Sequence, residues 1–135
     1  MSLVTWSSDQ SVILAAHAVA GPDDPELLAA IDDVAADGST DLHAGLVAGY
    51  DLAAETAGPG RVSRVILISD GGANAGVTDI DLIAAHASAE DEDGIYLVGV
   101  GVGSAETYND TLMDTVTDAG KGASVFVPDQ YEASR

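Results

Sequence analysis

The chain has 135 residues, which suits a single domain, and its 23 acidic against four basic residues give a net charge of −19. Nucleic acids and anionic membrane surfaces are therefore not expected as partners, because phosphate contacts need clustered Lys and Arg. Cations and basic protein surfaces are favoured instead. Cysteine is absent, which excludes disulfides and thiolate metal sites, and no apolar run approaches the ~20 residues needed to span a bilayer.

The chain opens with a predicted β-hairpin followed by a helix. The hairpin consists of LVTWSS (residues 3–8) and SVILAA (residues 11–16), two apolar runs separated by a short polar stretch. The helix is predicted over residues 23–38, where Asp24 suits the N-cap, Pro25 the first turn and Gly38 the end. Its predicted apolar face consists of Leu27, Leu28, Ile31, Val34 and Ala35.

Buried strands then alternate with helices through the rest of the chain. The strands are predicted at residues 64–69, 94–103 and 123–127, and the helices at residues 40–57, 78–94 and 109–120. Gly45 and Gly49 are expected to let the first of these helices pack closely on a sheet, while Asn109 and Gly120 would cap and end the last. The alternation predicts an α/β fold with a largely parallel sheet.

Asp70 stands where a buried strand meets glycine, in the stretch RVILISDGG (residues 64–72). In parallel sheets, ligands bind beyond the carboxyl ends of the strands. This rule places Asp70, the loop at residues 103–109 and the loop at residues 38–40 on one functional edge. An Asp after a strand also commonly forms a turn, so the sequence leaves both roles open for this residue.

Three blocks of sequence resemble the von Willebrand factor A domain and occur in the order of that family. They are DGSTDLHAGLVAGYDLA (residues 37–53), RVSRVILISDGGANAGVTD (61–79), and GIYLVGVGVG followed by YNDTLMDTVTDAGKG (within 94–122). The chain is similar to the bacterial branch of calcium-activated chloride channel-like and YfbK-like proteins over nearly all of its length. The resemblance implies a doubly wound, mostly parallel sheet with helices on both faces. It also implies a divalent cation, usually Mg²⁺, at a metal-ion-dependent adhesion site.

By this resemblance, Thr40 and Asp70 correspond to ligands of the cation, and Ser39, Asp41 and Gly71 lie at the edge of the site. Hydroxyl and carboxylate oxygens are donors that a hard cation accepts. A structural role is the alternative for two of these residues. Thr40 could cap the helix that follows it, and Asp41 could cap that helix or line the same cleft.

The remaining polar candidates favour structural roles. Asn74 is expected in a turn, and Asp79 is expected to be an N-cap. Residues 99–103, GVGVG, lack the G-x-G-x-x-G spacing of a dinucleotide-binding loop and are expected to let a strand end pack close to helices. No helical metal-pair spacing relates the three histidines, which are His17, His43 and His86.

The sequence departs from the family pattern at its N-terminal end. The family's Asp-x-Ser-x-Ser motif is not found, and Met1 corresponds to the start of the family's second strand. We therefore expect residues 1–135 to form a single, N-terminally truncated domain that lacks the first central strand. It is expected to bind Mg²⁺ weakly or not at all, because this ion needs its geometry supplied by several ligands. The neighbouring strands could close up, accept the missing part from elsewhere, or pair with a second copy as a homo-oligomer, and self-association is favoured.

These features predict a protein–protein recognition module rather than an enzyme. In the complete domain, a protein partner would bind the metal through an acidic side chain. Two alternatives stay open, namely a Mg²⁺-dependent α/β hydrolase-like domain that uses Asp70, and a structural fragment that only self-associates. The hydrolase would need a second acid or a nucleophile near Asp70.

Overall fold

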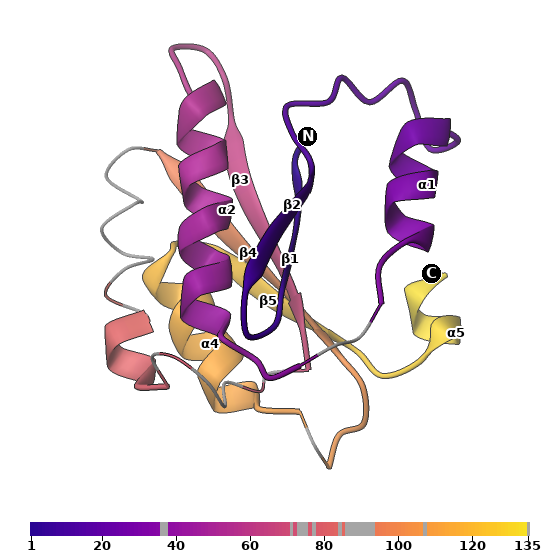
Figure 1. Ribbon diagram of the computed structural model, residues 1–135. Helices are drawn as coiled ribbons and strands as arrows, with labels where there is room; N and C mark the ends of the chain where they lie inside the picture. The colour runs from indigo at the N-terminus through magenta and orange to yellow at the C-terminus, as the bar shows by residue number, and fades with distance from the viewer. Residues whose placement is uncertain are drawn as a thin grey trace.

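The computed structural model contains two separate β-sheets (Figure 1). An antiparallel hairpin pairs β1 (Leu3–Trp6) with β2 (Gln10–Leu14), and a parallel sheet has the strand order β3-β4-β5. The latter strands span Ser63–Ser69, Ile95–Val102 and Ala123–Val127. The residues that the structure describes are 1–35, 38–70, 72, 76, 78–83, 85, 94–106 and 108–134. Both the predicted hairpin and the predicted parallel sheet are confirmed.

The helices lie on both sides of the sheets. On one side, α2 (Leu42–Thr56) and α4 (Asp110–Ala119) pack against β3, β4 and β5. On the other side lie α1 (Pro25–Asp32) and the short α5 (Gln130–Ala133), in contact with β2 and β5 respectively (Figure 1). Residues 80–83 are also helical. None of the described helices combines the length and the apolar character that crossing a bilayer requires.

The core lies on the side of the parallel sheet that faces α2 and α4. It consists of Leu42, Leu46, Tyr50, Leu67, Ile83, Ile95, Leu97, Leu112, Met113 and Val116. Along β3, burial alternates, so that Leu67 is buried whereas Ile66 and Ile68 remain 61% and 57% exposed. The prediction of a buried strand therefore holds for one face of β3. Only the face toward α2 is covered by described residues.

Helix α1 is shorter and more exposed than its sequence predicts. Asp24 is its N-cap, as predicted, but the helix ends at Asp32 rather than near Gly38. None of its residues is buried, and Leu28 and Ile31 are 45% and 47% exposed. The predicted apolar face is therefore largely exposed, because an amphipathic pattern buries a helix only where a partner surface exists.

The buried carboxylate of Asp24 holds this helix to the segment before it. Asp24 accepts hydrogen bonds from the backbone N–H groups of Ala20 (2.8 Å) and Leu27 (3.0 Å), and its Oδ2 lies 2.9 Å from His17 Nε2. The two backbone hydrogen bonds and then the His17 contact lower the pKa of Asp24 well below its usual range. His17 therefore belongs to the cap region of α1.

Acid should weaken this cap. Because the pKa of Asp24 is lowered on folding, its contribution to stability is present above the unfolded-state value of about 3.9 and is lost as the pH falls through the lowered value. Urea unfolding of the native chain and of Asp24→Asn should therefore show a stability difference that is constant near about pH 6 and shrinks toward about pH 2. If the stability difference between the two proteins grew on acidification, the lowered pKa of Asp24 would be contradicted.

Glycines in β4 allow α4 to approach the sheet. A Cβ added at Gly99 would lie 2.7 Å from Thr117 Cγ2 and 2.8 Å from Met113 Sδ. Thr117 and Met113 are both fully buried, so neither can move aside easily. The predicted role of GVGVG, close packing of a strand on a helix, is confirmed at Gly99.

The Gly99→Ala substitution should therefore destabilise the fold by about 1–3 kcal/mol through overpacking. Gly58→Ala is the matched control, because Gly58 has ordinary backbone angles and no atom within 4 Å of an added Cβ. The control should leave the free energy of unfolding unchanged or slightly higher. Urea unfolding measures the free energy of unfolding of both variants. If Gly99→Ala and Gly58→Ala lowered it equally, close packing at Gly99 would not be the cause of the destabilisation.

Candidate metal centre

The carboxyl end of β3 is tied to the start of α4. Asp70 follows the buried Ser69 and is itself exposed. Its Oδ1 accepts a hydrogen bond from the N–H of Gly72 (3.0 Å), which is the turn geometry expected of an Asp after a strand. Its carbonyl oxygen accepts from the N–H of Asn109 (3.4 Å), the predicted and confirmed N-cap of α4. The loop that leads to Asn109 therefore lies at the same edge as Asp70, as predicted.

The start of α2 lies at this edge as well. Asp41 is the N-cap of α2, and its Oδ1 accepts from the N–H of Ala44 (3.0 Å). The N–H of Asp41 donates to the carbonyl oxygen of Ser7 (3.0 Å), just beyond β1. An added Cβ at Gly76 would overlap the Asp41 carboxylate. The end of β1, Gly76 in the segment after β3, and the start of α2 are thus brought together around Asp41.

Thr40 is half-buried immediately before this cap. The capping role that the sequence left open between Thr40 and Asp41 belongs to Asp41. Ser39 is exposed, and its N–H lies 3.4 Å from Ser8 Oγ. The hydroxyl-bearing turn of the hairpin therefore also reaches this edge. Ser7 and Ser8 do not follow the family's Asp-x-Ser-x-Ser order and were therefore not predicted at this edge, although their hydroxyl groups are the signal that could have indicated it.

Three further expectations concern residues after Asp70. Gly71 and Asn74 lie outside the described residues. Asp79 is confirmed as a cap, because its Oδ1 accepts from the N–H groups of Asp81 (3.0 Å) and Leu82 (3.3 Å). Its carboxylate is therefore committed to a helix N-terminus rather than to the edge around Asp70.

An aromatic pair flanks the edge beside α4. The ring of Tyr108 stacks on Phe126 with 4.5 Å between centroids. An added Cβ at Gly101 would overlap the Tyr108 ring, so this ring lies directly over the backbone of β4. Burial, followed by the charges of Asp110 and Asp114, raises the pKa of Tyr108. The phenol therefore stays protonated at neutral pH and can donate a hydrogen bond.

The polar atoms at the edge suit a hard cation better than a soft one. Hydroxyl groups come from Ser39 and Thr40, and carboxylates come from Asp41 and Asp70. Oxygen donors of this kind are what Mg²⁺ and Mn²⁺ accept. Within the described ranges, however, no three His, Asp or Glu side chains form a cluster that could hold a metal ion. Oxygen donors are therefore present at this edge, but the described residues do not include a three-residue cluster that could hold a metal ion.

The fold is that of an α/β domain with polar side chains at the carboxyl edge of its parallel sheet, and comparison with known proteins identifies its family. The model of the von Willebrand factor type A domain matches residues 1–134, so the chain belongs to that family. Domains of this family are generally protein-interaction modules with a divalent metal at a metal-ion-dependent adhesion site.

One curated relative and several solved structures support this assignment. The chain is 31% identical over 135 residues to the uncharacterized protein YfbK of Escherichia coli (strain K12), of which it spans 23%. Among solved structures, a von Willebrand factor type A protein from Catenulispora acidiphila matches with a TM-score of 0.75 at 19% identity, over 98% of this chain and 30% of that one. Proximal thread matrix protein 1 of the mussel byssus, whose structure has a zinc-occupied metal-ion-dependent adhesion site, matches with a TM-score of 0.72 at 20% identity. The match covers 98% of this chain and 33% of that one.

The geometry of Asp41 predicts a stability effect that is independent of metal. Asp41→Ala removes the cap of α2 and should lower the free energy of unfolding by about 1 kcal/mol in metal-free buffer. Asp41→Asn should lower it much less, since Asn caps a helix about as well as Asp. Urea unfolding in the presence of a chelator measures both. Equal losses in the two variants would mean that the charge of Asp41, rather than its cap, stabilises the edge.

Proposed function

We propose that this chain recognises a protein partner at the carboxyl edge of its sheet, through a divalent cation that bridges the edge to an acidic side chain of the partner. Thr40 and Asp70 are the proposed ligands, and Ser39, Asp41 and Gly71 the proposed rim of the site. Mg²⁺ is the proposed ion, because all the donors are hydroxyl or carboxylate oxygens.

The observation that carries this proposal is the way helix starts are held to strand ends at one edge. The hydrogen bond from Asp41 to Ser7 holds the start of α2 to the end of β1, and the hydrogen bond from Asn109 to Asp70 holds the start of α4 to the end of β3. A rigid set of oxygen donors is what a cation with strict geometry requires. Family membership supports the same role, because domains of this family generally bind a divalent metal there.

An incomplete coordination sphere limits the affinity. Mg²⁺ dehydrates reluctantly and needs several fixed ligands, whereas two carboxylates and two hydroxyls from a single edge leave much of the sphere to water. The isolated chain is therefore proposed to bind the ion weakly. The proposed activity is recognition without turnover, which distinguishes it from a hydrolase that would use Asp70 as a catalytic acid or base.

Calorimetric titration with Mn²⁺ tests the site directly. In buffer with about 0.15 M salt, which screens the acidic surface, the native chain should show saturable binding with a dissociation constant of about 1 mM. Asp70→Ala should abolish the saturable component. Asp51→Ala, which removes an exposed carboxylate from the middle of α2, should retain it and controls for the loss of one negative charge.

Two results would count against the proposal. Identical isotherms for the three proteins would mean that Mn²⁺ binds only diffusely to the acidic surface. Hydrolysis of a phosphate ester by the native chain that is lost in Asp70→Ala would instead indicate an enzyme.

A further inference from the structure

Strand β5 forms one edge of the parallel sheet. Among the described residues it pairs with β4 alone, so the backbone N–H and C=O groups that point away from β4 have no strand partner. Its five residues, Ala123–Val127, include neither a proline nor a charged side chain, which are features that block the pairing of an edge strand. Pro128 follows directly and has no N–H to donate. This edge can therefore accept one short added strand.

The side chains of β5 alternate between two different environments. Ser124 lies on the side of α4, because its hydroxyl donates a hydrogen bond of 2.5 Å to Oδ1 of Asp114 on that helix. Phe126 lies on the same side, where its ring stacks on Tyr108. Val125 lies on the opposite side and is 52% exposed. A strand added beside β5 would therefore present every second residue to α4.

Helix α4 carries a row of carboxylates along this edge. Asp110, Asp114 and Asp118 are four residues apart, so they lie along one face of the helix, and all three are exposed. The hydrogen bond from Ser124 fixes the middle carboxylate next to β5. Burial, and then the charges of Asp110 and Asp114, raise the pKa of Tyr108, because both carboxylates lie near its ring. The row and the aromatic pair therefore border the same strand.

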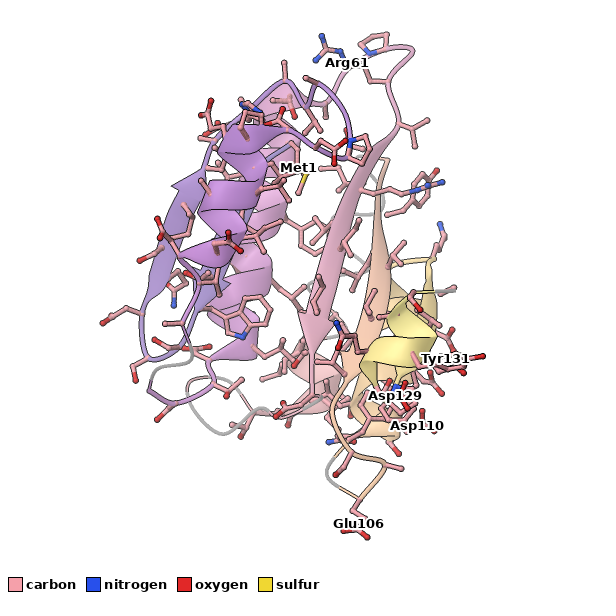
Figure 2. The ribbon with its side chains drawn as sticks, turned by 90° about the vertical axis from the view of Figure 1, so that its right-hand side faces the viewer. Met1, Arg61, Glu106, Asp110, Asp129 and Tyr131 are labelled. Carbon is pink, nitrogen blue, oxygen red and sulfur yellow. The ribbon has the colours of Figure 1, made fainter. Side chains whose placement is uncertain are left out.

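The negative charge is concentrated toward the end of β5. Asp129 follows the strand, whereas Lys121 precedes it. Figure 2 shows Asp129 and Asp110 toward one end of the molecule and Arg61 at the opposite end. The net charge of the whole chain is −19. Such a field attracts cationic partners and repels anionic ones.

The spacing of a β-sheet determines what an added strand would contact. Side chains that lie directly opposite each other on paired strands have Cβ atoms about 5 Å apart. A residue beside Ser124 would therefore reach Asp114, and a residue beside Phe126 would reach Asp110 and the aromatic pair. Arginine suits both positions, since its guanidinium group pairs with carboxylates and stacks on aromatic rings. Apolar, β-branched residues suit the positions between them, which lie on the side of Val125.

We propose that the free edge of β5 binds an extended basic segment of another protein, in which two arginines are separated by one apolar residue, as an added strand. Main-chain hydrogen bonds to β5 supply affinity, and the carboxylates of α4 select the positive side chains. This site uses neither Asp70 nor a metal ion, so it is separate from the candidate metal centre.

A second copy of this chain is a poorer occupant of the same edge. If two β5 strands paired, the carboxylate rows of both α4 helices would lie on the same face of the joined sheet. Like charges that meet across paired strands are destabilising, and each copy also has a net charge of −19. A basic strand instead neutralises the carboxylates that border the edge.

The probe is the peptide Thr-Arg-Val-Arg-Val-Thr, acetylated and amidated so that only its arginines are charged. Its binding to the isotopically labelled chain is followed by nuclear magnetic resonance in about 0.15 M salt, which screens diffuse attraction. A chelator removes any contribution from metal. The amide resonances of residues 123–127 should shift saturably, and nuclear Overhauser effects should connect the peptide backbone to that of β5.

A control peptide tests the alternating pattern. Thr-Arg-Arg-Val-Val-Thr has the same composition and charge, but its adjacent arginines point to opposite faces of a strand, so only one can face α4. It should bind about threefold more weakly than the probe, which is the effect expected from the loss of one exposed ion pair.

A pair of chain variants tests the location. Asp114→Asn removes one carboxylate of the row but keeps an oxygen that can accept the hydrogen bond from Ser124, and it should weaken binding of the probe about threefold. Asp51→Asn is the matched control, because it removes one exposed carboxylate from α2 instead. It should bind the probe like the native chain.

Four results would overturn the proposal. Equal affinity for the two peptides, or equal weakening in the two variants, would mean that the acidic surface attracts arginine without strand pairing. Unchanged amide resonances in β5 at saturating probe would place binding elsewhere. The fourth result is a shift of the same resonances with the concentration of the chain alone, together with no effect of the probe. It would mean that a second copy occupies the edge.

Discussion

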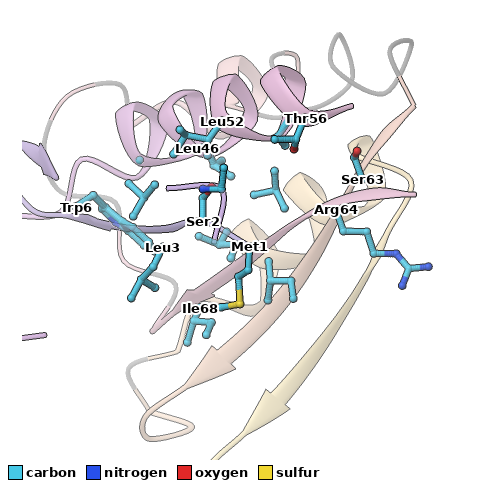
Figure 3. Close-up of a pocket in the computed structure, with 18 of the residues that line it drawn as sticks. Met1, Ser2, Leu3, Trp6, Leu46, Leu52, Thr56, Ser63, Arg64 and Ile68 are labelled. Atoms are coloured by element: carbon cyan, nitrogen blue, oxygen red, sulfur yellow. The ribbon is translucent and has the colours of Figure 1, made fainter. Parts of the chain in front are cut away.

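Helix α2 holds together two sheets that share no strand pairing among the described residues, and the rest of the molecule depends on this contact. Gly45 lies against the Trp6 ring of the hairpin, and Gly49 lies against Val65 of β3, with 3.3 Å between an added Cβ and Val65 Cγ1. The two glycines are four positions apart and therefore share one face of the helix. Their missing side chains let a single helix face approach both sheets at once. A cavity of about 870 Å³, lined by α2, lies between the hairpin and β3 (Figure 3).

The same bridge explains why the carboxyl edge is ordered although the sheets are separate. Asp41 caps α2 and contacts Ser7 beyond β1, so the end of the hairpin is fixed to the helix rather than to a neighbouring strand. On the opposite side, the contact between Asp70 and Asn109 fixes β3 to α4. The oxygen donors at this edge are therefore positioned by helix starts, which are rigid because their N–H groups are capped.

Local features were predictable from the sequence because they depend on neighbours in the chain. The caps at Asp24 and Asn109 and the hairpin all rest on residues within a few positions of one another. The close approach of Gly45 and Gly49 was also predictable, since small residues at helical spacing indicate a packed face. The choice between Thr40 and Asp41 as the cap of α2 was not, because both residue types cap helices and only the backbone decides which one is in position.

Burial was harder to predict, since it depends on surfaces that the sequence does not specify. Leu28 and Ile31 belong to the predicted apolar face of a helix, and Ile66 and Ile68 belong to a strand that was predicted to be buried. All four are exposed, because α2 and α4 lie on one side of the parallel sheet and α1 and α5 cover little of the other. Apolar periodicity therefore indicates which residues can be buried, whereas the partner element determines whether they are.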